Sequence, residues 1–338
     1  MEKLINSLFL PENLPDPTKN VSICHTHIST VFVGDTYVYK IKKPVDFGFL
    51  DFTSLEKRKY FCDEEFRLNR RLSPLIYLDV LPVFFDGSNY KIANKAEGKV
   101  VDYAVKMLRI PQETLMKNHL KNGSFTDRQF KSLAETLAAF HKSAERSERI
   151  DRFGSLESIK FNTDENFDQI KPFIDDERGI KKDVFDNLRI WTLIFYNEHG
   201  KLFDDRIKNR KICDCHGDLH MEHICFTDPI SIIDCIEFNE RFRFSDSLAD
   251  IAFLLMDMEF HNENRFSKML WNNYKSSAGE TDDMEILLTF YKVYRAIVRG
   301  KVNCFLSKDP ALDKTNKNEA LTIAADYFSL AAYYIKNF

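Results

Sequence analysis

The stretch CHGDLHMEHICFTDPISIID, residues 215–234, decides the expected fold of this chain. It contains two short runs of β-forming residues, ICF and ISII, separated by the turn sequence TDP. A hairpin of this size brings the residue before its first strand beside the residue after its second. We therefore expect His223 and Asp234 to be neighbours, with Asp218 one short loop away.

The spacing of the polar residues in this stretch resembles the catalytic loop of protein kinases. That loop runs His-Arg-Asp, with an Asn five residues after the Asp and a metal-binding Asp beyond a hairpin. The corresponding positions here are His216, Asp218, His223 and Asp234. Such a set suits phosphoryl transfer, because that reaction needs positioning and charge neutralisation more than covalent chemistry from the protein.

Two details resemble the aminoglycoside phosphotransferase family more than the protein kinases. They are Gly217 in place of the Arg, and the run HGDLH followed by DCIEF at 234–238. The longer string DCIEFNERFRFSDSLADIAFLLMDME is similar to a bacterial branch of that family, some of whose members carry an additional P-loop ATPase domain. No G-x-x-x-x-G-K-[ST] occurs in this sequence, so we expect no such domain in it. The resemblance covers most of the chain and is most specific around 213–259.

The resemblance implies an α+β, protein-kinase-like fold in two lobes, and the residue pattern agrees. Strands and one helix are predicted up to Leu108, and the sequence Thr53-Ser-Leu-Glu56 predicts a capping box that begins this helix. After Pro111 the pattern is mostly helical, and the hairpin is the one β-rich element. We expect a nucleotide-binding N-lobe over residues 1–109 and a helical C-lobe with the catalytic loop and substrate site over 110–338.

The nucleotide-binding residues are predicted from the β-rich half. A kinase-like site needs a strand lysine on the phosphates and a glutamate that holds it from the next helix. Lys40 lies on a predicted strand, and Glu65 lies on a largely apolar helical stripe, where an unpaired carboxylate would be costly. Lys42 shares the face of Lys40 and is the alternative. By the resemblance, ATP would bind against the hinge at Met107 and Arg109.

The resemblance gives separate roles to the remaining site residues. Asp218 would be the base that orients the acceptor hydroxyl, and Asp234 with His223 would hold Mg²⁺. Because an imidazole favours transition metals more than the expected Asn does, Mn²⁺ is the other candidate; His223 could instead hydrogen-bond the loop or a phosphate. Asp250 would brace the catalytic loop through its backbone. Glu237 would either support the metal ligand Asp234 from behind or lie on the surface as a solvated charge.

Several other polar residues are expected to have no role in the site. Arg295, Arg299 and Lys301 are expected on a solvated helix face, and His141 is expected to be a hydrogen-bonded core residue. The acidic residues of 157–188 could contact a cationic acceptor, but we favour a solvated acidic surface. They are Asp164, Glu165, Asp168, Asp175, Asp176 and Glu177.

The composition of the chain sets its broad class. Its 338 residues are 44% hydrophobic and 30% charged, as in soluble globular proteins. The net charge of −4 and the lack of a basic block argue against nucleic-acid binding. No apolar run approaches the ~20 residues of a membrane span, and the apolar N-terminal stretch is too short for a signal peptide, so a cytoplasmic location is expected. Seven scattered cysteines form no disulfide framework.

The expected function is ATP-dependent phosphorylation of a hydroxyl on a sugar, an aminoglycoside or a related small molecule, with no obligate protein partner. Two alternatives stay open. One is a catalytically silent nucleotide-binding module (a pseudokinase), suggested by His223 and by the single glycine of the predicted phosphate-covering loop, residues 29–37. The other is a structural zinc-binding domain. Its potential ligands are Cys213, Cys215, His216, His220, His223 and Cys225.

Overall fold

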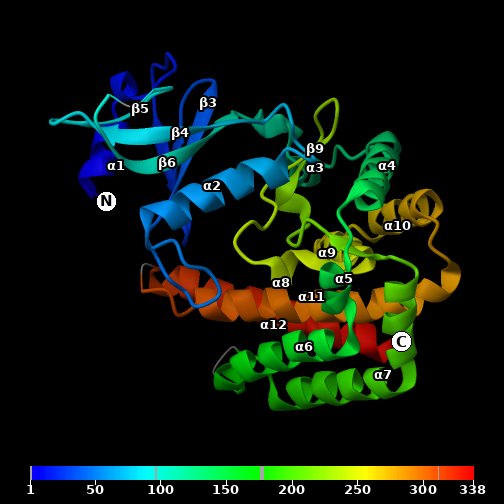
Figure 1. Ribbon diagram of the computed structural model, residues 1–338. Helices are drawn as coiled ribbons and strands as arrows, with labels where there is room; N and C mark the ends of the chain where they lie inside the picture. The colour runs from blue at the N-terminus through cyan, green and yellow to red at the C-terminus, as the bar shows by residue number, and fades with distance from the viewer. Residues whose placement is uncertain (1, 96, 176–178, 311) are drawn as a thin grey trace. The chain divides into compact units, whose positions relative to one another are not determined.

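The computed structural model describes residues 2–95, 97–175, 179–310 and 312–338. The chain divides into two compact units. The first consists of Met1–Phe125 and Glu222–Glu240, and the second of Thr126–Met221 and Arg241–Phe338. The first unit contains an antiparallel sheet and the second is mostly helical, so the chain has the predicted α+β, protein-kinase-like two-lobe fold (Figure 1).

The first unit is built on a six-stranded antiparallel sheet of order β1-β2-β3-β6-β4-β5. The strands are β1 (Ser22–His25), β2 (Ser29–Val33), β3 (Tyr37–Lys42), β4 (Tyr77–Phe85), β5 (Tyr90–Ile92) and β6 (Lys99–Leu108). Alternation along β3 gives its two faces different partners. Tyr39 and Ile41 pack into an apolar core with α1 (Glu2–Leu8). Lys40 and Lys42 lie on the opposite face, where their ammonium groups meet a glutamate of α2 (Leu55–Asn69).

Helix α2 begins one residue later than its predicted capping box implies. Ser54 is the N-cap, and its side chain accepts a hydrogen bond from the Lys57 backbone N–H at 3.2 Å. The Thr53 hydroxyl instead donates to Asp51 at 2.6 Å, which takes it away from the helix end. The helix packs on β4 and β6 and buries its Glu65 side chain completely.

The hairpin predicted from the 215–234 stretch is present and belongs to the first unit. Strands β8 (Ile224–Cys225) and β9 (Ser231–Ile232) pair antiparallel, with Ile224 opposite Ile232. The Phe226 N–H donates to the Thr114 carbonyl at 2.7 Å, beside the short helices η2 (Gln112–Thr114) and α3 (Met116–Asn122). This bond, the hydrogen bond of the Ser73 hydroxyl to the Ile232 carbonyl at 2.7 Å and the contact of Lys40 with Asp234 join the segment to the first unit, although sequence alone assigned it to the C-lobe.

The second unit is a set of packed helices. Its main helices are α4 (Asp127–Ser143), α6 (Leu156–Ile170), α7 (Lys182–Lys208), α9 (Ser247–Phe260), α10 (Asn264–Ala278), α11 (Glu285–Leu306) and α12 (Lys314–Lys336). Thr126 and Gln129 form a capping box at the start of α4, with both of its hydrogen bonds present. Helices α11 and α12 lie side by side, as do α4 and α10 (Figure 1). Among the described residues no helix is both long enough and apolar enough to cross a membrane.

A second small sheet supports the catalytic loop. Strands β7 (Ile212–Asp214) and β10 (Phe244–Asp246) pair antiparallel, so the prediction of a single β element after Pro111 is wrong. Strand β7 leads directly into the 215–221 loop. Strand β10 follows the short helix α8 (Glu240–Arg243) and leads into α9, whose first turn is capped by Asp246.

Candidate functional site

Lys40 is the centre of a charged cluster in the first unit. Its Nζ lies 2.7 Å from Asp234 Oδ1 and 2.9 Å from Glu65 Oε1. Burial alone would lower the pKa of Lys40, but Asp234 and then Glu65 outweigh it and hold that pKa well above its usual value. The two lysines of β3 likewise lower the pKa of Glu65 despite its burial. The predicted lysine–glutamate pair is therefore formed and fully charged.

Lys42 lies in a different environment from Lys40. Its side chain is 1% exposed against 12% for Lys40, and its Nζ donates to Glu65 Oε2 at 2.8 Å and to Glu237 Oε1. Lys42 is thus enclosed by carboxylates, whereas Lys40 also reaches Asp234. Glu237 is buried, which excludes the surface-charge alternative. The sequence did contain a signal for it, since two lysines on one buried strand face need more than one carboxylate.

Asp234 is held from two elements of the first unit. Its backbone N–H donates to the Tyr77 hydroxyl of β4 at 3.2 Å, and the next N–H, of Cys235, donates to Asn69 Oδ1 of α2 at 2.9 Å. Its φ of 64° lies in the left-handed region, which residues other than Gly adopt at some cost in free energy. The carboxylate remains 46% exposed. Backbone contacts therefore present this side chain to solvent in a fixed position.

His223 and Asp234 are neighbours, as the hairpin predicted. The Ile233 N–H donates to the His223 carbonyl at 3.0 Å, and His223 Nε2 lies 3.7 Å from Asp234 Oδ2. That distance is too long for a direct hydrogen bond. A nitrogen donor beside a half-exposed carboxylate fits a divalent cation in charge and in donor type.

Met107 and Arg109 lie at the end of β6. Met107 pairs with Val38 of β3 and with Tyr77 of β4. The Arg109 guanidinium donates to the Gly34 carbonyl at 3.0 Å, so this side chain holds the turn between β2 and β3. The structure thus places both residues at the C-terminal end of a central strand that pairs with the strand of Lys40, and their role in nucleotide binding stays a prediction.

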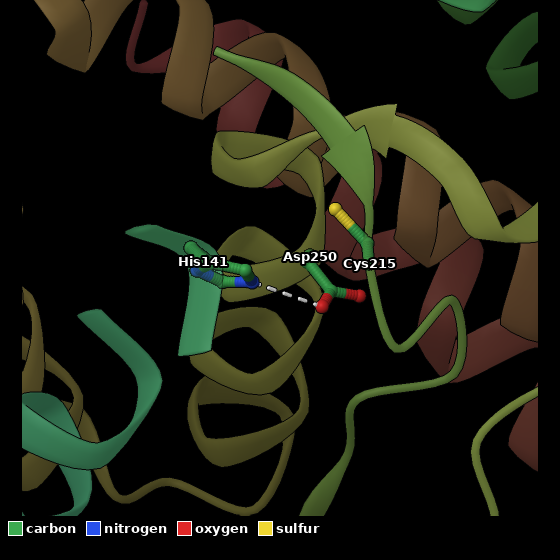
Figure 2. Close-up of side chains that lie close together, drawn as sticks. All are labelled: His141, Cys215 and Asp250. Carbon is green, nitrogen blue, oxygen red and sulfur yellow. Dashed lines mark hydrogen bonds and ion pairs between the residues drawn. The ribbon is translucent and has the colours of Figure 1, made fainter. Parts of the chain in front are cut away.

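Asp250 braces the catalytic loop in the second unit. Its two carboxylate oxygens accept the backbone N–H groups of His216 and Gly217, each at 2.9 Å. Figure 2 shows His141 beside this carboxylate, with Nε2 at 3.1 Å, and His141 Nδ1 lies 2.8 Å from the Tyr274 hydroxyl. The predicted brace and the predicted core histidine are both confirmed.

Cys215 completes the trio of Figure 2, and its ligand atom lies within 4.8 Å of those of His141 and Asp250. Each of these groups already has a protein partner, and the Cys215 thiol donates to the Ser245 carbonyl at 3.4 Å. Burial raises the pKa of Cys215 well above its usual value, which disfavours the thiolate that metals bind. The sulfur of Cys213 lies 3.5 Å from it. This cluster therefore gives the zinc alternative no support.

Asp218 lies on the loop that Asp250 braces. Its Oδ2 is 3.4 Å from Nε2 of the buried His220, and the pKa of His220 is raised because Asp218 outweighs burial. The Arg295 guanidinium donates to the Gly217 carbonyl at 3.1 Å, and the charge of Arg299 also acts on Asp218. The prediction of a solvated face for these two arginines is therefore wrong. Arg295 contacts the loop, and Arg299 donates to the Tyr327 hydroxyl of α12 at 3.4 Å.

Three of the acidic residues of 157–188 named above have partners in the structure. Glu165 pairs with Arg241 at 2.5 Å and Asp168 with Lys171 at 2.6 Å. Asp175 accepts the Lys182 N–H at 3.0 Å. Asp176 and Glu177 lie outside the described residues. The described pairs leave this segment with less free negative charge than its composition indicates.

Comparison with known proteins identifies the family. Residues 58–286 match the model of the phosphotransferase enzyme family (APH). The chain belongs to this family. Uncharacterized proteins of Mycobacterium tuberculosis and Mycobacterium bovis are each 30% identical to this chain over 285 residues, covering 84% of the chain and 55% of the relative. The chain thus spans about half the length of these relatives.

Solved structures of other proteins share the fold of this chain. A putative aminoglycoside phosphotransferase from Ralstonia eutropha JMP134 has a TM-score of 0.55 at 11% identity, covering 98% of this chain and 97% of that one. An amicoumacin kinase in complex with AMP-PNP and Ca²⁺ has a TM-score of 0.54 at 14% identity, covering 95% and 89%. A choline/ethanolamine kinase family protein from Mesorhizobium loti has a TM-score of 0.53 at 14% identity, covering 95% and 94%. At these identities the likeness shows the fold.

Proposed function

We propose that this phosphotransferase transfers the γ-phosphoryl group of ATP to a hydroxyl of a small molecule. The observation that carries the proposal is the pairing of Lys40 with Asp234 at 2.7 Å, backed by the buried Glu65. A partly accessible cation beside a half-exposed carboxylate can exchange its partner for phosphate oxygens. The carboxylate so released would hold a divalent cation together with His223.

The roles of the chain's own residues follow from these contacts. Lys40 would bind phosphate oxygens while Glu65, itself paired with Lys42, keeps its position. Bound Mg²⁺ would neutralise charge on the phosphates. The backbone around Met107 and Arg109 would contact the nucleotide base, within the nucleotide-binding lobe proposed for residues 1–109.

Asp218 would accept the hydrogen bond of the acceptor hydroxyl and take its proton. The new bond joins the acceptor oxygen to the γ-phosphorus, the bond to the β-phosphate oxygen breaks, and ADP leaves. Asp250 and Arg295 hold the backbone on either side of Gly217. A base fixed in this way orients the attacking oxygen, which is the main contribution a protein makes to phosphoryl transfer.

Nucleotide binding tests the proposal directly. Millimolar ATP with Mg²⁺ or Mn²⁺ should raise the melting temperature, because a ligand that binds the folded state stabilises it. Lys40→Ala should abolish the increase. Lys59→Ala, which removes a more exposed lysine of α2 paired with Asp63, should leave it intact. An unchanged melting curve of the wild type would refute the proposed function.

A second candidate, the catalytically silent nucleotide-binding module, is favoured by one observation. His223 stands where the family motif expects Asn and lies beside Asp234. Release of ADP in the presence of a panel of sugars and aminoglycosides distinguishes the two. Nucleotide binding without ADP release for any acceptor would support the silent module.

A further inference from the structure

Lys301 of α11 is a cation whose direct partners are neutral. Its Nζ donates to Asn166 Oδ1 at 2.6 Å and to Gln169 Oε1 at 2.9 Å, both on α6. The carboxylate of this region, Glu165, is already paired with Arg241 at 2.5 Å. These side chains, here called the Lys301 cluster, therefore combine two cations, two amides and a single carboxylate. The prediction that Lys301 lies on a solvated face is wrong.

The Lys301 ammonium is held in an unfavourable environment. The pKa of Lys301 is lowered to about 8, chiefly by burial. The charge of Glu165 acts to raise it and the charge of Arg241 acts to lower it. Lys42 is buried and Lys40 is mostly covered, but adjacent carboxylates raise the pKa values of both. A half-buried cation without a carboxylate of its own is unfavourable, and groups perturbed in this way are enriched at functional sites.

The amides of α6 provide an independent sign of a missing ligand. Asn162, Asn166 and Gln169 follow one another at spacings of four and three residues, so they share one face of the helix. Asn166 is only 3% exposed, and its Nδ2 has no hydrogen-bond partner among the described residues. Buried amide donors are nearly always paired in folded proteins. The cluster thus retains an unused N–H donor next to a cation.

Residues of the Lys301 cluster lie on elements that are connected to the catalytic loop along the chain or by strand pairing. Arg241 lies in α8, which runs into β10, and β10 pairs with β7 immediately before the loop. Lys301 follows Arg299 by two residues on α11, and the charge of Arg299 acts on Asp218. All of these residues belong to the second unit. Arg241 is thus linked through β10 and β7 to the loop that carries the proposed base, and Lys301 belongs to the same helix as Arg299.

We propose that the Lys301 cluster binds an anionic group, a carboxylate or a phosphate monoester, on the acceptor whose hydroxyl Asp218 orients. The inference rests on the proposed function and narrows the acceptor to an anionic polyol, such as a sugar acid or a sugar phosphate. Amide groups and a lysine suit hydroxyls and an anion. Phe161, 59% exposed with Arg241 5.1 Å from its ring, offers an apolar surface to sugar carbons. A polycationic acceptor would meet two cations here.

Thermal shifts with matched sugars test the proposal. Glucuronate and glucose 6-phosphate are compared with glucose and glucosamine at pH 7 and equal ionic strength, and the two anions show whether a carboxylate or a phosphate is preferred. At least one anion should raise the melting temperature more than the neutral and cationic sugars do. Equal shifts for all four sugars would overturn the proposal, whereas a missing shift with Mg·ATP would instead refute the proposed function.

Substitutions at Lys301 locate the effect. Lys301→Gln should lose the anion-induced shift and keep the shift with Mg·ATP. Without ligand it should melt no lower than the wild type at pH 7, because the cost of the buried charge is gone. Lys171→Gln, which removes an exposed lysine paired with Asp168, should retain the anion response. An anion shift that survives Lys301→Gln would contradict the assignment.

The pH dependence provides a second readout. Glu165 and Arg241 are the charged groups that act on Lys301. Since its pKa is about 8, the anion-induced shift should be smaller at pH 9 than at pH 7. Lys301→Arg stays protonated and should retain the shift at pH 9. An equal loss between pH 7 and pH 9 in the wild type and in Lys301→Arg would show that another group binds the anion.

Discussion

The charged network of the first unit and the buried carboxylate of the second are held in opposite ways. Asp234 and Glu65 are bonded to lysine side chains, and Asp234 is half-exposed. Asp250 is fully buried and accepts two backbone N–H groups of the catalytic loop. A flexible ammonium group can exchange its partner for a ligand, whereas backbone donors cannot leave. The first arrangement suits binding, and the second suits fixing the position of Asp218.

The largest effect is expected at Asp218, which the second arrangement positions. Asp218→Asn should reduce the rate of phosphoryl transfer by about 100-fold to 10⁴-fold, the usual contribution of a positioned base. Its melting-temperature increase with Mg·ATP should be unchanged, because the predicted nucleotide ligands belong to the first unit. ADP release and thermal shift measure the two quantities separately. A variant that lost both to the same extent would show that Asp218 also binds the nucleotide.

The two lysines of β3 should separate binding from stability. Lys42→Ala leaves Glu65 and Glu237 buried without this cation and should lower the free energy of unfolding by about 3–5 kcal/mol. Lys40→Ala should lower it less, because Lys40 is more exposed and Lys42 still pairs with Glu65. Urea unfolding measures both.

A double variant provides the control for Lys42. Lys42→Met combined with Glu237→Gln removes one charge of each sign and should recover part of the lost stability. Equal stability losses for Lys40→Ala and Lys42→Ala would mean that the two positions do not differ as their burial indicates.

The local features of the site were predictable from sequence. The pairing of Lys40 with Glu65 was expected from the kinase-like template. The contact of His223 with Asp234 depends on a short hairpin turn, and the places of Lys40 on a strand and of Glu65 on an apolar helical stripe depend on periodicity. These rules involve neighbours along the chain. The catalytic-loop brace followed instead from a family motif.

The features that were missed depend on distant partners. Strand β10 has three residues and pairs with β7 across about thirty residues, so no run of β-formers announced it. Arg295 resembles a surface residue in sequence, but its partners are backbone carbonyls of Gly217 and Ala249. Helix α6 was not predicted, because its buried face includes Asn166 and Thr163 as well as apolar residues. Only the fold shows what such polar groups contact.

The brace of the second unit should give stability a defined pH dependence. The pKa of His141 is raised to about 9 from 6.5, since Asp250 outweighs burial. A raised folded-state pKa stabilises the protein below pH 6.5, and this contribution is lost as the pH rises through 9. The size of the pKa change corresponds to roughly 3 kcal/mol.

The melting temperature measured across this range checks the assignment. The wild type should lose stability between pH 6.5 and 9, and His141→Gln should show a flatter profile over the same interval. His261→Gln, at an exposed position after α9, serves as the control. A slope that persists in His141→Gln would assign the titration to another group. At low pH the corresponding loss of stability comes from protonation of Asp250. The pKa of this carboxyl is lowered to about 2, so its stabilising contribution is lost only as the pH falls through that value.

The smallest effect concerns the choice of metal by the first unit. An imidazole nitrogen is a softer ligand than the Asn oxygen of the family motif and favours Mn²⁺ over Mg²⁺. If His223 and Asp234 share an ion, the melting-temperature increase with ATP should be larger with Mn²⁺ than with Mg²⁺, and His223→Asn should shift the preference several-fold toward Mg²⁺. His25→Asn, at an exposed position in β1, should leave the preference unchanged. The 3.7 Å between Nε2 and Oδ2 leaves these atoms without a direct hydrogen bond to each other. Equal responses to the two metals in the wild type and in His223→Asn would instead assign His223 to hydrogen bonding of the loop or of a phosphate.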